Sequence, residues 1–309
     1  MSPLRTAVEE YLELRRGLGF SLRLPGAMLR HFAAFLEREG APYITRELAL
    51  RWAQLPANVQ PATWASRLRT VRRFAQFWSA SDPRTEVPPL GLLPHRYRRK
   101  PPYLYTEDEV RRLIAVARRL PSATGLRPAT YATLVGLLAV TGMRISEALA
   151  LNRADVDGAE AVLTIRRTKF GKSRLVPVHP STQHALGRYA RRRDRVYPKP
   201  TTESFFVSER GARLTEWTVR YTFNRLSRRI GLRGPADRRG PRLHDFRHRL
   251  AVNTLLRWYR AGVDVERHLP ALSTYLGHGH VGDTYWYLSA VPELLRLAAA
   301  RLEARGGRS

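Results

Sequence analysis

The stretch Leu243-His244-Asp245-Phe246-Arg247-His248 lies near the C-terminus, and Leu276-Gly277-His278 follows it, with Tyr287 nine positions after His278. Two more segments with reactive side chains lie upstream, Thr141-Gly142-Met143-Arg144-Ile145-Ser146-Glu147-Ala148-Leu149 and Thr168-Lys169-Phe170-Gly171-Lys172-Ser173-Arg174. Together they offer a phenol, guanidinium groups, imidazoles and an amine. A protein that breaks a phosphodiester with its own side chain needs such groups. A tyrosine of pKa about 10 must lose its proton, cations must hold the phosphate oxygens, and an acid must protonate the leaving oxygen.

In this order and spacing the motifs resemble the tyrosine recombinase, or phage integrase, family, and the resemblance covers essentially the whole chain. It implies a mainly α fold with a small β-sheet or hairpin. An N-terminal helical, SAM-like core-binding domain would precede an α+β catalytic domain. It also implies a site-specific DNA recombinase that cleaves and rejoins strands through a 3′-phosphotyrosyl intermediate, for integration, excision or transposition. The short N-terminus favours a mobile-element integrase or transposase.

The resemblance and the chemistry of each side chain together give the expected catalytic roles. Tyr287 is expected to be the nucleophile, and Arg144 and Arg247 to clamp the scissile phosphate with paired N–H donors that lysine does not reproduce. His244 lies three positions before Arg247, hence on the same helical face, and is expected to accept the tyrosine proton or to bond the phosphate. The full expected set is Arg144, Lys169, His244, Arg247, His278 and Tyr287.

The remaining two members of the set are a histidine and a lysine. His278 is expected to be a second phosphate ligand. Lys169, at the tip of a hairpin, is expected to give a proton to the leaving 5′-oxygen. Lys172 competes for that role, but it follows the Gly171 turn, and the family pattern favours the earlier lysine.

Two other tyrosines lie close to the expected nucleophile. Tyr285 and Tyr275 point in other directions from Tyr287 if the segment is helical, so only one phenol can face the phosphate. The family's spacing selects Tyr287. Tyr285 and Trp286 are predicted to be packing residues.

The motifs also contain carboxylates and several histidines. Glu147 is expected to orient Arg144 or to buffer its charge, and Asp245 to act as a positioning or capping residue. The chain has no Cys and no His-Glu-x-x-His arrangement, so we predict no metal site and no cofactor. Because cationic side chains would do the work of a divalent metal, cleavage is expected to proceed in the presence of a chelator.

Composition points to a polyanionic partner. The formal charge is +28, and Lys occurs at only four positions, so fifty of the 54 basic residues are Arg, whose planar fork matches phosphate oxygens. Part of this bias is expected from codon usage in a GC-rich genome. Double-stranded DNA is the predicted partner, and no membrane association is predicted because no apolar run is long enough to span one. The absence of Cys and of an export signal indicates the cytoplasm. With the family resemblance and the predicted DNA partner, we expect a bacterial, nucleoid-associated protein.

Residues 1–87 are predicted to form a helical core DNA-binding domain, because apolar residues recur near the 3.6-residue period in four stretches. The polar side of the fourth stretch carries a basic stripe that we expect to face DNA rather than solvent alone. Its members are Arg67, Arg69, Arg72 and Arg73.

Residues 88–102 are predicted to be an extended basic linker, since clustered prolines cannot continue a helix. It is expected to cross a DNA backbone, although a solvated tether would have the same composition. Its basic residues are Arg96, Arg98, Arg99 and Lys100. Lys172 and Arg174 complete the predicted DNA-binding residues.

Residues 103–309 are predicted to be the catalytic domain. It opens with a capping box at Thr106-Glu107-Asp108-Glu109, and alternating apolar residues from Ala161 to Val178 predict a hairpin. The tail from about 292 to 304 is a predicted amphipathic helix with no obvious partner in its own domain. The stretch Trp258 to Pro270 is longer than in the simple chromosome-dimer resolvases and is interpreted as a subgroup insertion.

The resemblance also implies how the protein would assemble. A homotetramer on two duplexes is expected, with the C-terminal helix inserted into a neighbouring protomer. A monomer in solution and a partner recombinase both remain open. Two alternative functions are a type IB topoisomerase-like DNA-relaxing enzyme and a catalytically silent DNA-binding regulator.

Overall fold

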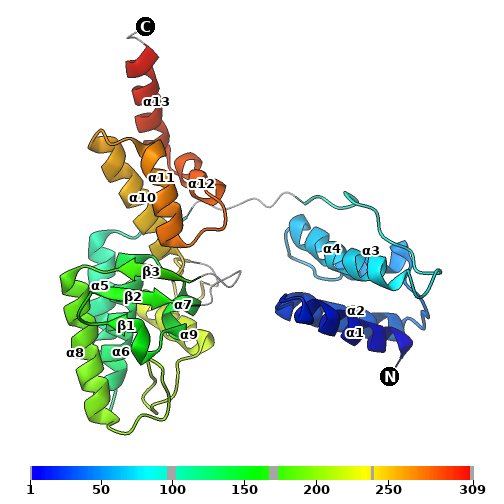
Figure 1. Cartoon of the computed structure of the whole chain (residues 1–309), viewed down its shortest axis with the longest axis horizontal. Helices are drawn as coiled ribbons and strands as arrows, with labels where there is room; N and C mark the ends of the chain where they lie inside the picture. Colours follow the sequence, from blue (N-terminus) through cyan, green and yellow to red (C-terminus); the bar gives the residue numbers. More distant parts are fainter. Residues whose placement is uncertain (1, 96–101, 167–172, 238–239, 307–309) are drawn as a thin grey trace. The chain divides into compact units, whose positions relative to one another are not determined.

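The computed structural model describes residues 2–95, 102–166, 173–237 and 240–306, which divide into two compact units, Met1–Lys100 and Pro101–Ser309. The described part of the chain is mostly helical and contains one small antiparallel sheet (Figure 1). The predicted fold class is confirmed. Within the described part of the chain, no helix is long and apolar enough to span a membrane.

The first unit is a bundle of α1 (Pro3–Gly17), α2 (Arg23–Arg38), α3 (Arg46–Gln54) and α4 (Pro61–Trp78), as the apolar spacing predicts. Ser2 and Thr45 cap α1 and α3. The side-chain hydroxyl of each accepts a backbone N–H from the first turn of the helix that follows it, and that N–H would otherwise have no partner within the helix. The core is aromatic: Trp52 is fully buried against Phe32.

The segment expected to be a linker begins as part of this bundle. Leu93 is buried in the same apolar cluster as the four helices, and Val87 packs against that cluster. The core of the first unit therefore extends into the range 88–95. The linker's basic residues at positions 96 and 98–100 lie outside the described residues.

The second unit begins with α5 (Glu107–Ala117), which the predicted capping box starts: the Thr106 hydroxyl accepts the Glu109 N–H, and the Glu109 carboxylate accepts the Thr106 N–H. The helices that follow are α6 (Leu126–Thr141), α7 (Ile145–Ala150), α8 (Pro180–Val196), α9 (Glu216–Arg229), α10 (Asp245–Arg260), α11 (Val265–Leu276), α12 (Gly282–Ala290) and α13 (Pro292–Gly306). Helices α5, α6, α8 and α9 surround the larger core of this unit.

The sheet pairs β1 (Val156–Asp157), β2 (Val162–Ile165) and β3 (Arg174–Pro177) in that order, with antiparallel neighbours. Leu163 of β2 lies opposite Val176 of β3, and both are buried. The predicted hairpin is thus present as β2 and β3. Strand β1 precedes it and was not predicted. Residues 167–172, between β2 and β3, include Lys169 and Lys172 and lie outside the described residues.

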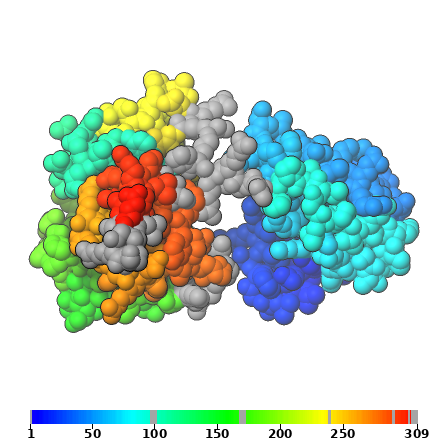
Figure 2. Space-filling model, turned by 90° about the horizontal axis from the view of Figure 1, so that it is seen from above, coloured from blue at the N-terminus to red at the C-terminus, as the bar shows by residue number. Residues whose placement is uncertain are grey.

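A second, smaller core joins α10 to α13. Leu255, Leu269, Tyr287 and Leu294 are buried together in it. The expectation that the C-terminal helix has no partner in its own domain is therefore wrong, because Leu294 of α13 is fully buried against these helices. Helix α13 contacts α10 and α12 and then projects beyond them (Figure 1), so its red atoms stand in front of the orange ones in the view from above (Figure 2).

Candidate active site

The first element of the site is the turn after α6. Gly142 ends that helix with φ of 58°, a left-handed conformation, and a Cβ there would come within 2.8 Å of Leu250 and 3.3 Å of the Arg247 backbone. The tight turn brings Arg144 to the start of α7. There its backbone N–H donates to the Glu147 carboxylate at 3.0 Å and its Nη1 donates at 2.7 Å.

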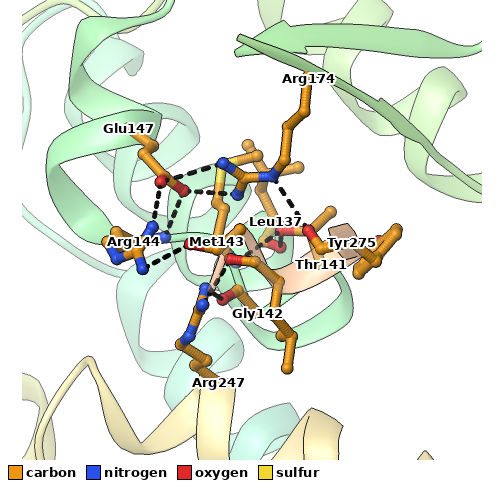
Figure 3. A network of polar contacts seen from close by, with 11 residues as sticks. Leu137, Thr141, Gly142, Met143, Arg144, Glu147, Arg174, Arg247 and Tyr275 are labelled. Atoms are coloured by element: carbon orange, nitrogen blue, oxygen red, sulfur yellow. Dashed lines mark hydrogen bonds and ion pairs between the residues drawn. The ribbon is translucent and has the colours of Figure 1, made fainter. Parts of the chain in front are cut away.

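Glu147 is buried, and two arginines share its carboxylate (Figure 3). Arg174 of β3 donates to it from Nη1 at 3.1 Å and from Nη2 at 2.8 Å. Burial by itself would raise the pKa of Glu147, but the hydrogen bonds from Arg174 and Arg144 outweigh it and hold that pKa below its ordinary value. The predicted orienting role of Glu147 agrees with this geometry.

Arg174 was predicted to contact DNA. In the structure its guanidinium lies inside the protein, with 11% of the side chain exposed, and its Nε donates to the Tyr275 carbonyl at 3.0 Å. It therefore joins β3 to α7 and to the end of α11. A DNA contact by Arg174 would first require this guanidinium to leave the Glu147 carboxylate.

The second turn of the site is Leu276-Gly277-His278 at the end of α11. Gly277 has φ of 68°, and a Cβ there would lie 2.7 Å from Nη1 of Arg174, so the turn requires glycine. Its carbonyl accepts Nη2 of Arg144 at 2.8 Å. The Leu-Gly-His motif thus serves to bring α11 against the Arg144 side chain.

Arg247 connects the two turns. Its side chain is 2% exposed; Nη1 donates to the Gly142 carbonyl at 3.1 Å and Nη2 donates to the Leu276 carbonyl. Burial, and then the charge of Arg144, lower the pKa of Arg247 to about 10. The guanidinium therefore remains charged at neutral pH, so two cations are held in one site on neighbouring turns.

Tyr287 lies on α12 and is 2% exposed. Its Oη is 3.1 Å from Nδ1 of His248, and its ring is nearly parallel to that of His278, with centroids 6.3 Å apart and an interplanar angle of 19°. Trp286 contacts both Tyr287 and His248. Trp286 thus packs as predicted, whereas Tyr285, predicted to pack, is 47% exposed, because it points to the opposite side of α12.

The expected histidines lie beside this tyrosine. His278 shares a hydrogen bond of 2.7 Å between Nδ1 and the Thr284 hydroxyl, and burial, followed by the Arg247 charge, lowers its pKa to about 4. His244 is the exposed N-cap residue of α10, with its ring centroid 4.8 Å from that of His248.

His248 was not among the predicted catalytic residues. The signal was present in the sequence, since His248 follows His244 by four positions and therefore lies one turn further along the same face. Its hydrogen bond to a residue 39 positions away could not be read from that spacing. Asp245, next to His244, is buried and accepts the Arg242 backbone N–H at 2.7 Å, in agreement with a capping role.

Five of the six predicted catalytic residues can be placed, and they gather around the ends of α6 and α11: Arg144, His244, Arg247, His278 and Tyr287. Lys169, the sixth, lies outside the described residues, as do Lys172, Arg96, Arg98, Arg99 and Lys100. Within the described ranges, no group of three or more His, Asp or Glu side chains is arranged to hold a metal ion.

The predicted basic stripe on α4 has two kinds of member. Arg69 and Arg73 are exposed. Arg67 instead stacks on the Trp52 ring, with its guanidinium carbon 3.8 Å from the ring centroid, and donates to the Trp52 carbonyl at 2.9 Å. Arg72 is partly buried. Arg69 and Arg73 can therefore contact a phosphate backbone, whereas the Arg67 guanidinium is already bound to Trp52 within the bundle.

Comparison with known proteins decides the family. Residues 104–293 match the model of the phage integrase family, which covers more than half of the chain. The chain belongs to that family of tyrosine recombinases. It is accordingly a DNA breaking-rejoining enzyme of site-specific recombination.

Relatives and solved structures are similar to this recombinase over most of its length. A protein of Sinorhizobium fredii, y4rB, whose name describes it as an integrase/recombinase, is 54% identical over 99% of this chain and 98% of its own. The tyrosine recombinase XerD of Caulobacter vibrioides is 31% identical over 77% of this chain and 74% of its own. The Tn1549 transposon integrase, solved with transposon right end DNA, is 16% identical with a TM-score of 0.67 over 98% of this chain and 99% of that one, and shares its fold.

Proposed function

We propose that this recombinase cleaves DNA by attack of the Tyr287 phenol on a phosphodiester, giving a 3′-phosphotyrosyl link and a free 5′-hydroxyl. The observation that carries the proposal is the convergence of Arg144, Arg247 and Tyr287. The two arginines bond successive carbonyls of the turn that ends α11, those of Gly277 and Leu276, and the ring of His278 in the same turn lies beside the Tyr287 ring. A phosphate entering the site would meet two guanidiniums whose charge matches the charge that develops on its oxygens.

The other predicted residues complete this proposal. His278 and His244 would donate to phosphate oxygens, and Lys169 would protonate the leaving oxygen. Because the phosphotyrosyl link conserves the energy of the broken bond, a second strand can be joined without ATP. No metal or cofactor is assigned a role.

The biological role proposed is integration, excision or transposition of a mobile element in a bacterial cytoplasm. The Tn1549 integrase, by its name, acts on a transposon, and its fold covers nearly all of this chain. The likeness supports this role without specifying the DNA sites. Footprinting on the DNA that flanks the gene would identify the bound inverted repeats.

The active form proposed is a homotetramer on two duplexes. Leu295 of α13 is 49% exposed, next to the buried Leu294, and offers an apolar contact to a neighbouring protomer. Truncation after Ala290 would also remove Leu294 from the core around Tyr287, so Leu295→Glu is the cleaner test. It is expected to reduce synapsis of two sites while single-site binding is unchanged.

The chemical proposal is tested with a suicide substrate that carries a nick beside the scissile phosphate of a footprinted site. Wild type should accumulate a covalent protein–DNA adduct that peptide mapping places on Tyr287, and Tyr287→Phe should form none. An adduct on another side chain, or relaxation of supercoils without exchange between two sites, would contradict the proposed recombination mechanism.

A further inference from the structure

The hydroxyl of Tyr287 lies against an imidazole to which no role has yet been given. Nδ1 of His248 is 3.1 Å from Oη, and the His248 side chain is 12% exposed. The Trp286 ring and the His244 ring flank it, with centroids 5.5 Å and 4.8 Å away. His248 is therefore held in one orientation between neighbouring rings.

The far side of the imidazole faces a buried carboxylate. Nε2 of His248 is 4.0 Å from Oδ1 of Asp245, which is itself 1% exposed and fixed by Arg242. If the phenol donates its proton to Nδ1, the ring hydrogen is on Nε2, on the side of Asp245. An imidazolium formed there would have a negative charge close to it.

We propose that His248 is the general base for Tyr287 in strand cleavage. As Oη forms its bond to phosphorus, the phenolic proton passes to Nδ1 of His248 and the bond from phosphorus to the 5′-oxygen breaks. A separate acid, proposed above as Lys169, protonates that oxygen. In the rejoining step the 5′-hydroxyl attacks phosphorus while Lys169, neutral after cleavage, takes back the hydroxyl proton, and His248 returns its own proton to the departing tyrosine oxygen. This inference rests on the proposed phosphotyrosyl mechanism and specifies its proton path.

Burial, together with nearby charges, keeps His248 neutral before DNA arrives. Burial, and then His244, Arg242, Arg247 and His278, lower its pKa to about 3, so Nδ1 is unprotonated and ready to accept. Asp245 is the opposing charge on the same helix. A bound phosphate would offset the nearby cations and raise the basicity of His248 at the time when the proton must move.

His244 is the alternative base predicted from the motif. It is the exposed cap of α10, whereas His248 is the histidine hydrogen-bonded to the phenol. The two residues lie one turn apart on α10, which makes them a matched pair for mutation. His244 remains suited to a phosphate oxygen.

The experiment compares His248→Asn with His244→Asn in the full-length protein on the suicide substrate. Asparagine places Oδ1 near the position of Nδ1, so it keeps an acceptor for the phenol but cannot take its proton. His248→Asn is expected to bind the site with unchanged affinity and to lower the single-turnover cleavage rate about 100-fold or more. Its rate should then rise with pH between about 6 and 9, as a phenol that ionises without help requires.

A second measurement separates a base from an acid. A substrate with sulfur at the bridging 5′ position has a leaving group that needs no proton, so it should restore cleavage by Lys169→Ala and not by His248→Asn. In His248→Ala, added imidazoles should restore cleavage in the order of their basicity. If His248 only positions Tyr287, the extent of rescue would depend on the size of the added imidazole and not on its basicity.

The results that overturn the inference are distinct from those that overturn the proposed function. His248→Asn cleaving within threefold of wild type, or rescue of its rate by the bridging sulfur, would remove His248 as the base. So would a wild-type cleavage rate that rises tenfold per pH unit from 6 to 9, a measurement that needs no variant to fold. Failure of Tyr287→Phe to abolish the adduct would instead reject the phosphotyrosyl mechanism itself.

Discussion

Arg174 of β3 and Glu147 of α7 face each other with both terminal nitrogens of the guanidinium on the carboxylate, at 3.1 and 2.8 Å. The same carboxylate orients Arg144, and the same guanidinium holds the Tyr275 carbonyl. The hairpin, the first arginine motif and the end of α11 thus depend on one nearly buried ion pair.

Replacement of Glu147 by Gln should destabilise the second unit and reduce cleavage together. Removal of one partner from a buried pair leaves an uncompensated charge, which costs about 3 kcal/mol. Calorimetry of the full chain should show the transition of the second unit lowered by roughly 8 °C. The exposed pair Arg220–Glu216 supplies the control, and Glu216→Gln should leave the transition essentially unchanged. Equal shifts for the two variants would contradict the proposed importance of the buried pair.

Substitution of Gly142 by Ala should move α10 and impair the site. Both Gly142 and Gly231 end a helix with positive φ, at 58° and 78°, but nothing lies within 4 Å of a Cβ built at Gly231. Alanine at either position is expected to destabilise the fold by about 1–2 kcal/mol, because a residue with a Cβ is unfavourable in the left-handed conformation. Only Gly142→Ala should also lower the cleavage rate, because its Cβ meets the Arg247 backbone and Leu250. Comparable rates for the two variants would argue against this contact.

Acid should weaken the second unit through His248. Its pKa is about 3 in the folded protein and about 6.5 when unfolded, so the unfolded chain binds the extra proton between these values. The stability that His248 contributes is therefore complete above pH 6.5 and is lost as the pH falls toward 3. Urea unfolding of wild type and His248→Asn should show a difference in slope of about 1 kcal/mol per pH unit between pH 6 and 4.5. If the unfolding free energies of the two proteins changed with pH at the same slope, the lowered pKa of His248 would be contradicted.

The arginines of α4 are expected to have two different functions, DNA binding for Arg69 and Arg73 and stabilisation of the bundle for Arg67. Arg69→Ala and Arg73→Ala are expected to reduce the salt dependence of DNA binding by about one ion each, with little change in thermal stability. Arg67→Ala should instead destabilise the bundle by about 1–2 kcal/mol, because it removes the stack on Trp52 and a hydrogen bond. Binding titrations at several salt concentrations and thermal melts would distinguish the two effects, and an Arg67 variant of unchanged stability would contradict the assignment.

Cleavage should continue in EDTA. The proposed site stabilises the phosphate with Arg144 and Arg247, which do not depend on an added ion. The suicide-substrate assay with EDTA should give at least half of the adduct formed without it. A strict requirement for added Mg²⁺ would count against a purely side-chain mechanism.

The parts of the fold that were predictable are those specified by local chemistry. The Thr106 capping box and the glycine after α6 mark helix ends through contacts within a few residues. The order of the motifs then gave the family and the residues that meet around Tyr287. Strand β1 escaped prediction because its two residues are too short to show an alternating pattern.

What the sequence did not predict depends on contacts between distant segments. Arg174 turns inward because Glu147, 27 positions away, arrives beside β3 as a buried acceptor. His248 meets Tyr287 because the small core of α10 to α13 brings their helices together. Neither relation leaves a spacing signature, and both change the role assigned to a residue.

The burial of Tyr287 has a consequence for the cell. A protein with fifty arginines will associate with any stretch of the chromosome by charge alone. Tyr287 is 2% exposed, so a protomer travelling along such DNA would carry its proposed nucleophile covered. If Tyr287 attacks DNA as proposed, breakage requires a rearrangement that uncovers it, and a site that induces this rearrangement would be cut in preference to the rest of the genome.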